Sequence, residues 1–304
     1  MIIIMNNALL QPAAAAFRRS KNAEREAMSA GFENATTKSV EVNGTPFIFR
    51  EMGEKGGVPV IFLHHLTAVL EDWDPRVVDG LAANHHVIIF DNRGVGASGG
   101  STPNSVEEMA ADAVAFIVAL GFAKVDLFGF SLGGFVAQVI AQQWPGLVRK
   151  IILAGTGPAG GEKNGDVAAV LQDAFAKAAA HGKPPKHFLF FSQSADGQAA
   201  AHDFHQRLQE RAKDRDTPVT NETIQAQIVA IHTWGQGDAA ALSTVEHPVL
   251  VANGDHDIMV PSINSFELAR RLPNAQLSIF PGAGHGGIFQ YHALFVQQAL
   301  NFLR

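Results

Sequence analysis

The sequence LFGFSLGGF, from Leu127 to Phe135, places Ser131 between glycines two residues before it and two residues after it. The apolar run KVDLFGF (124–130) predicts a buried strand, and SLGGFVAQVIAQQWP (131–145) predicts a helix. A sharp turn between them forces the serine into a strained backbone conformation that leaves no room for side chains at the flanking glycines. The pattern therefore predicts a nucleophilic hydroxyl at the carboxyl end of a strand.

The start of the helix supplies a second element of this chemistry. The N–H of Leu132 points toward the same space as the serine hydroxyl, and the helix N-terminus carries partial positive charge. A negative oxygen that develops on a substrate would be stabilised there. We therefore expect the N–H of Leu132 to belong to an oxyanion hole.

A serine nucleophile needs a base and an orienting acid, which follow it in the order acid and then histidine. Asp255 and Asp257 come directly after the predicted strand HPVLVANG (247–254), and His285 follows the last predicted strand. Open α/β sheets place ligand-binding groups beyond the carboxyl ends of their strands. His285 is therefore the candidate base, and either aspartate is a candidate acid.

Short apolar runs alternate with helical patterns from Ser39 onward, which indicates βαβ units and a doubly wound, mostly parallel sheet of eight strands. Asn43-Gly44 between the first two runs predicts an antiparallel hairpin at one edge. The predicted strands are 39–44, 46–51, 58–64, 86–91, 124–130, 149–155, 247–254 and 275–282. Predicted helices include one that begins at Ser105 with Glu108 three residues later, which is a capping-box pattern.

One interval interrupts the alternation. Residues 161–246 contain helical patterns, such as 166–182 and 221–235, and no good strand. We therefore expect an α/β core of residues 37–160 and 247–304 that carries a helical insertion. Residues 1–36 are expected to form a poorly structured or helical extension, with a membrane or partner hook as the less favoured alternative.

Composition narrows the class of protein. The chain has 304 residues, 47% of them hydrophobic and 17% charged, and a formal net charge of −6. This balance argues against a nucleic-acid-binding protein, which would carry a basic stripe. The absence of cysteine excludes disulfides, thiolate metal sites and a cysteine nucleophile. No apolar run approaches the ~18 residues of a membrane span, and we expect a cytoplasmic protein.

The sequence resembles the α/β-hydrolase superfamily from about Thr37 to the C-terminus. The motifs that carry the resemblance are GFSLGG, FDNRGVGAS (90–98), NGDHDIMVP (253–261) and PGAGHGG (281–287). In this superfamily the acid usually lies in the pattern G-x-x-D-x-x-x-P, which implies Asp257 rather than Asp255. The position after the sixth strand, where some members carry the acid, reads LAGTGPAGG and has no carboxylate.

The resemblance also implies that the insertion is a helical cap and that a serine, rather than an aspartate, at the nucleophile position means acyl-enzyme chemistry. The sequence departs from the family at His65, where many members have glycine. Leu66 would then be the second oxyanion donor, and the His65 side chain either narrows the pocket, contacts substrate or binds loop backbone. Neither His64-His65 nor Asp255-His256-Asp257 has the spacing of a full metal-ligand set.

These inferences converge on a serine hydrolase that cleaves a small to medium carboxylic ester or lactone, without cofactor or metal. Ser131, Asp257 and His285 are the expected catalytic residues, and the N–H groups of Leu66 and Leu132 the expected oxyanion hole. Perhydrolase (haloperoxidase-type) or acyltransferase activity on the same residues is an alternative, as is a non-enzymatic ligand receptor on the same fold. The sequence leaves the substrate and the oligomeric state open.

Overall fold

The computed structural model describes residues 31–304, so most of the expected extension, residues 1–36, lies outside the described residues. At the start of the described residues, the short 3-10 helix η1 (Phe32–Asn34) packs onto the rest of the protein. Phe32 and Ala35 are buried, and the backbone N–H of Phe32 donates to the carboxylate of Asp79 at 2.6 Å. These residues therefore form part of the folded body.

An eight-stranded mixed sheet runs through the protein in the order β1-β2-β4-β3-β5-β6-β7-β8. The β1 strand pairs antiparallel with β2, β2 pairs antiparallel with β4, and the remaining pairs are parallel. Asn43 and Gly44 have positive φ angles at the β1–β2 turn, as the hairpin signal predicted. The strands are β1 (Lys38–Val42), β2 (Thr45–Met52), β3 (Val60–Leu63), β4 (Val87–Phe90), β5 (Val125–Phe130), β6 (Val148–Ala154), β7 (Val249–Gly254) and β8 (Ala275–Phe280). The predicted fold class is confirmed.

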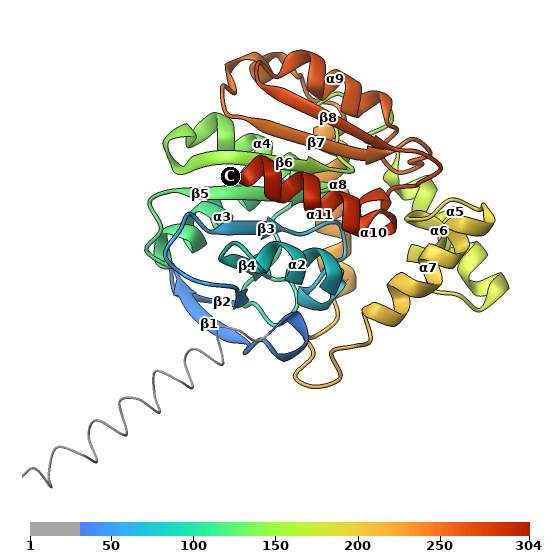
Figure 1. Ribbon diagram of the computed structural model, residues 1–304, viewed down its shortest axis with the longest axis horizontal. Helices are drawn as coiled ribbons and strands as arrows, with labels where there is room; N and C mark the ends of the chain where they lie inside the picture. Colours follow the sequence, from blue (N-terminus) through green and yellow to red (C-terminus); the bar gives the residue numbers. More distant parts are fainter. Residues whose placement is uncertain (1–30) are drawn as a thin grey trace, which may run out of the picture.

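Helices cover both faces of this sheet (Figure 1). On one face α2 (Pro75–Ala82) packs against α11 (His292–Leu303), and on the other α3 (Val106–Ala119) packs against α4 (Leu132–Gln143). The helix α9 (Ile263–Arg271) covers β7 and β8. Strands β3, β4 and β5 are buried along their whole length because they lie between these layers, which explains their continuous apolar runs.

All regular secondary structure between β6 and β7 is helical. This segment contains α5 (Val167–His181), α6 (Lys186–Leu189), α7 (Ala195–Arg207), α8 (Asn221–Gly235) and η4 (Ala240–Thr244). Figure 1 shows α5, α6 and α7 together at one end of the sheet, where α7 packs against the short helix α10 (Gly287–Gln290). The remaining 3-10 helices are η2 (Leu70–Asp72) and η3 (Pro145–Leu147).

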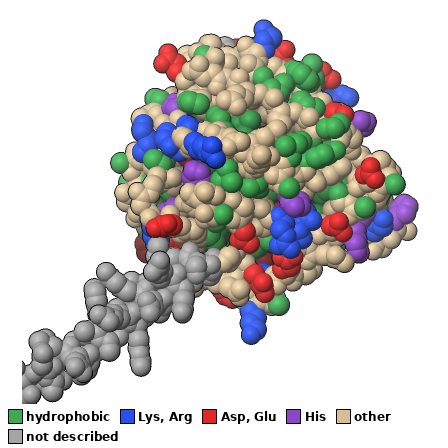
Figure 2. Space-filling model, viewed as in Figure 1, with side chains coloured by type: hydrophobic (Ala, Val, Ile, Leu, Met, Phe, Trp, Pro, Cys, Tyr) green, Lys and Arg blue, Asp and Glu red, His purple; other side chains and the backbone are tan. Residues whose placement is uncertain are grey.

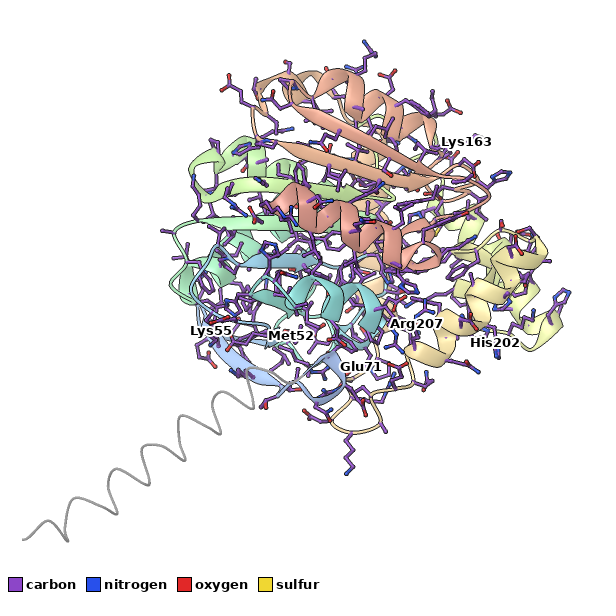
Figure 3. All side chains as sticks on the ribbon, viewed as in Figure 1. Met52, Lys55, Glu71, Lys163, His202 and Arg207 are labelled. Atoms are coloured by element: carbon purple, nitrogen blue, oxygen red, sulfur yellow. The ribbon has the colours of Figure 1, made fainter. Side chains whose placement is uncertain are left out.

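Ion pairs join this helical segment to the sheet domain. Arg207 of α7 donates to both carboxylate oxygens of Asp74, which also caps α2, and the two charges meet at the junction where Figure 3 labels Arg207. Glu71 lies in the same junction and forms ion pairs with two buried arginines: Arg50 of β2 at 2.6 Å and Arg211 at 3.5 Å. One carboxylate therefore neutralises charge from both parts of the protein.

Acidic and basic side chains are interspersed over the face of the molecule that Figure 2 shows. Within residues 31–304, no helix combines the length and the apolar character that crossing a membrane requires.

The Glu71 junction generates a prediction about stability. Glu71→Gln removes the carboxylate that pairs with Arg50 and that shares Arg211 with Asp214, so we expect the free energy of unfolding to fall by about 3–5 kcal/mol, the cost of breaking a buried ion pair. Glu267→Gln is the matched control, because Glu267 pairs with Arg270 and Arg271 on the exposed surface of α9, where solvent screening makes the expected loss much smaller. Urea unfolding of both variants measures the difference; equal losses would contradict the prediction.

Candidate functional site

Ser131 lies at the tight turn between β5 and α4, as predicted. Its backbone adopts φ 56° and ψ −118°, a region that non-glycine residues rarely occupy. Hydrogen bonds hold this conformation: the Ser131 N–H donates to the carbonyl of Ala154 at 2.9 Å, and the Ser131 carbonyl accepts from the Gly134 N–H at 2.8 Å and the Thr156 hydroxyl at 2.9 Å. The strained turn is therefore fixed from β6 as well as from its own helix.

The positions around Ser131 require glycine because a side chain there would clash with neighbouring atoms. A Cβ atom at Gly133 would lie 2.0 Å from the carbonyl oxygen of Leu63, and one at Gly129 would lie 2.4 Å from the carbonyl oxygen of Gly133. A Cβ atom at Gly134 would meet Thr156 at 2.5 Å. These distances are far shorter than van der Waals contact, so the helix can approach β3 and β6 this closely only without side chains at these positions.

Asp257 and His285 form a buried pair. The Nδ1 atom of His285 and the Oδ2 atom of Asp257 are 2.7 Å apart, and both side chains are fully buried. The other Asp257 oxygen accepts from the backbone N–H groups of Met259 at 2.8 Å and Val260 at 2.9 Å. In a neutral imidazole this geometry assigns the hydrogen to Nδ1, which donates to the Asp257 carboxylate, and leaves Nε2 as an acceptor.

The imidazole of His285 lies beside the strand ends that hold Ser131. A Cβ atom at Gly155 would be 3.2 Å from the imidazole ring, and Gly155 directly follows Ala154, whose carbonyl binds the Ser131 backbone. The His285 Nε2 atom is buried and has no hydrogen-bond partner among the described residues. The structure thus brings Ser131, Asp257 and His285 to the same edge of the sheet.

Asp255 is placed differently from Asp257. It lies on the surface, where its carboxylate pairs with the exposed imidazole of its neighbour His256. Of the two aspartates that the sequence left as candidates, only Asp257 contacts His285. Among the described residues no group of three or more histidines and carboxylates could hold a metal ion.

Leu132 and Leu66 flank the serine from two elements. Leu132 is the first residue of α4, so its N–H has no acceptor within the helix. Leu66 follows β3 and lines a small cavity together with Ser131. The next residue, Thr67, has φ 65° and donates its N–H to the side chain of Gln227 on α8 at 2.9 Å. The loop that carries Leu66 is therefore held by the helical segment.

His64 and His65 have different surroundings. His64 accepts from the indole N–H of the buried Trp73 at 2.8 Å and contacts Asp91 at 3.1 Å, so Nε2–H donates to that carboxylate. Burial lowers the pKa of His64 to about 4, so this ring is neutral near pH 7 and serves as a structural link. The Nδ1–H of His65 donates to the carbonyl of Leu66 at 2.7 Å, which orients the peptide that follows Leu66.

The small cavity over Ser131 is mostly apolar and takes its walls from three parts of the chain. Leu66, Ser131 and Phe135 come from the sheet domain, Asn164, Val167 and Ile231 from the segment between β6 and β7, and Met259 and Val260 from the loop after Asp257. Three of these residues, Asn164, Val167 and Ile231, were not predicted from the sequence. No local pattern marks them, because only the packing of α5 and α8 over Ser131 brings them to the site.

Aromatic side chains close the site on the histidine side. The rings of Phe130 and Phe190 both pack against His285, with centroid distances of 4.9 and 5.4 Å, and both also pack against His65. The carbonyl of Phe190 accepts the N–H of Gly286 at 2.7 Å. The region after α6 is therefore docked directly on the loop that carries the imidazole.

Several known proteins are similar to this chain in sequence or fold. A solved α/β hydrolase fold protein from Chitinophaga pinensis is 39% identical, with a TM-score of 0.86 over 90% of this chain and 99% of that one. A non-heme haloperoxidase from Rhodococcus erythropolis is 29% identical over 259 residues, which are 80% of this chain and 90% of that protein. A structure described as Est816, an N-acyl homoserine lactone degrading enzyme, shares the fold at 22% identity and a TM-score of 0.68, over 87% of this chain and 100% of that one.

The family model of the alpha/beta hydrolase fold matches residues 58–290, which are most of the chain. This match includes the turn at Ser131 and the loops of Asp257 and His285. The chain belongs to the α/β-hydrolase fold family.

Proposed function

We propose that this protein is a serine hydrolase that cleaves a small to medium carboxylic ester or lactone through an acyl-enzyme intermediate. The observation that carries the proposal is the buried Asp257–His285 hydrogen bond beside the strained Ser131. A nucleophile, a base and an acid that orients the base are the minimal set for acyl transfer by serine. No step of this chemistry requires a metal or another cofactor.

In the proposed mechanism the Ser131 hydroxyl attacks the substrate carbonyl while Nε2 of His285 accepts its proton. Asp257 holds the Nδ1–H tautomer and stabilises the imidazolium that forms. The N–H groups of Leu132 and Leu66 bind the oxygen that becomes negative. His285 then protonates the leaving group, and in the second half it activates the water that releases the acid.

The cavity favours an apolar acyl group of modest size, because Phe135, Val167 and Ile231 surround Ser131. We further propose that residues 161–246 act as a cap that excludes water and selects the acyl group. The solved neighbours described as an N-acyl homoserine lactone degrading enzyme and as a thermophilic esterase support ester or lactone substrates.

Perhydrolysis is a second candidate activity, supported by the curated relatives named haloperoxidase and chloroperoxidase. In that reaction hydrogen peroxide replaces water as the acceptor of the acyl group from Ser131. Acyl transfer to an alcohol would proceed in the same way. Product analysis with water, peroxide and alcohol in competition separates the three activities, because all share one acyl-enzyme.

The role of Ser131 leads to a first prediction. Ser131→Ala should reduce ester turnover by about a million-fold, the loss that removal of a triad member causes in a comparable enzyme. The thermal unfolding of the variant should remain close to wild type, because the hydroxyl makes none of the backbone bonds that fix the turn. Initial rates with short-chain nitrophenyl esters measure the loss. Activity above a few per cent of wild type would assign the nucleophile to another residue.

The two aspartates give a second prediction. Asp257→Asn should reduce kcat by about ten-thousand-fold, because an amide favours the wrong histidine tautomer. Asp255→Asn is the matched control: it follows the same strand, but its carboxylate faces solvent and His256, so we expect less than a three-fold change. Steady-state kinetics on both variants make the comparison. The reverse ranking would transfer the acid role to Asp255.

A further inference from the structure

One polar side chain other than Ser131 lines the cavity over the proposed nucleophile. In the described part of the chain, the walls of this cavity are apolar except for Ser131 and Asn164, and they carry no charged group. Asn164 precedes α5 and belongs to the segment that covers the site. A single polar group in an apolar wall is the usual way in which a binding pocket fixes the orientation of its ligand.

The orientation of the Asn164 amide is set by a hydrogen bond. Its Nδ2 group donates to the carbonyl of Pro158 at 2.7 Å, and the reversed amide would bring two acceptors together. The Oδ1 atom is therefore a fixed acceptor. The side chain is 2% exposed, and Oδ1 has no hydrogen-bond partner within residues 31–304. A buried acceptor without a donor is unfavourable, and at the wall of this cavity a donor on the substrate would pair it.

We propose that Asn164 selects acyl groups that carry a hydrogen-bond donor, a hydroxyl or an N–H, on the carbon atoms next to the reacting carbonyl. This inference rests on the proposed function and names its substrate class. A neutral acceptor in an uncharged, apolar cavity fits a short, neutral acyl chain with one donor. An unsubstituted chain of the same length meets the same apolar walls but leaves Oδ1 of Asn164 unpaired, so it binds the transition state less well.

Asn264 provides a matched control. It is 1% exposed, its Nδ2 group donates to the carbonyl of Glu162 at 2.8 Å, and its Oδ1 atom also lacks a partner among the described residues. Asn264 thus shares residue type, burial and unpaired acceptor with Asn164. It differs in that it does not line the cavity with Ser131. Both amides pack against Gly161, so Asn264→Leu disturbs the same packing without removing the acceptor that lines the cavity. A packing effect will therefore appear in both variants, whereas the loss of acyl choice will appear only in the Asn164 variants.

The test compares kcat/KM for the p-nitrophenyl esters of butyrate, 2-hydroxybutyrate and 3-hydroxybutyrate, which share chain length and leaving group. The enzymes are wild type, Asn164→Leu, Asn164→Ala and Asn264→Leu. We expect wild type to prefer one hydroxy ester over butyrate by roughly two- to ten-fold, the value of one neutral hydrogen bond. Both Asn164 variants should lose this preference, and Asn264→Leu should keep it.

The wild-type ratio tests the inference even if the variants do not fold. No preference of the wild type for either hydroxy ester would overturn the inference. A preference in Asn164→Leu or Asn164→Ala equal to that of the wild type would also overturn it. So would a loss of preference in Asn264→Leu as large as in the Asn164 variants. In each case continued hydrolysis of butyrate that depends on Ser131 would leave the proposed function standing. Absence of Ser131-dependent hydrolysis with all three esters would instead contradict the proposed function, and this inference with it.

Discussion

The close approach of α4 to the sheet at Ser131 is the constraint on which the site depends. The carbonyl of Leu63 occupies the space that a side chain at Gly133 would need, and β6 holds the serine backbone through the carbonyl of Ala154. The strained φ and ψ of Ser131 persist because these neighbours over-determine them. This turn makes the serine project at the N-terminus of α4, where unpaired backbone N–H groups carry partial positive charge. The strain is local, and the buried central strands of the sheet supply the stability that maintains it.

The other proposed catalytic groups depend on the same edge of the sheet. Asp257 follows β7 and is fixed by the backbone of Met259 and Val260, while His285 follows β8 and packs against Phe130 at the end of β5. Because parallel strands end at a common edge, residues that are more than a hundred positions apart in sequence become neighbours. The helical segment completes the arrangement through Phe190, which packs against His285, and through the ion pairs Arg207–Asp74 and Arg211–Glu71.

Much of this organisation could be predicted from the sequence because its physical causes are local. Apolar runs identified all eight strands, Asn43-Gly44 identified the hairpin, and the glycines around Ser131 identified the turn. The cavity walls could not be predicted, because Asn164, Val167 and Ile231 reach Ser131 only through the packing of α5 and α8. The aromatic side chains of the insertion were visible in the sequence, but their roles were not: Phe190 contacts His285, whereas Phe204 is fully buried against Phe289.

The central claim is that Ser131 is the single activated nucleophile of this protein. The most direct test is to treat the folded protein with a fluorophosphonate, digest it and locate the adduct by peptide mass spectrometry. We predict one phosphonylated site, at Ser131, formed rapidly and at one equivalent per chain, and no such adduct after unfolding in urea. An adduct on another residue, or a folded protein that remains unmodified, would contradict the account.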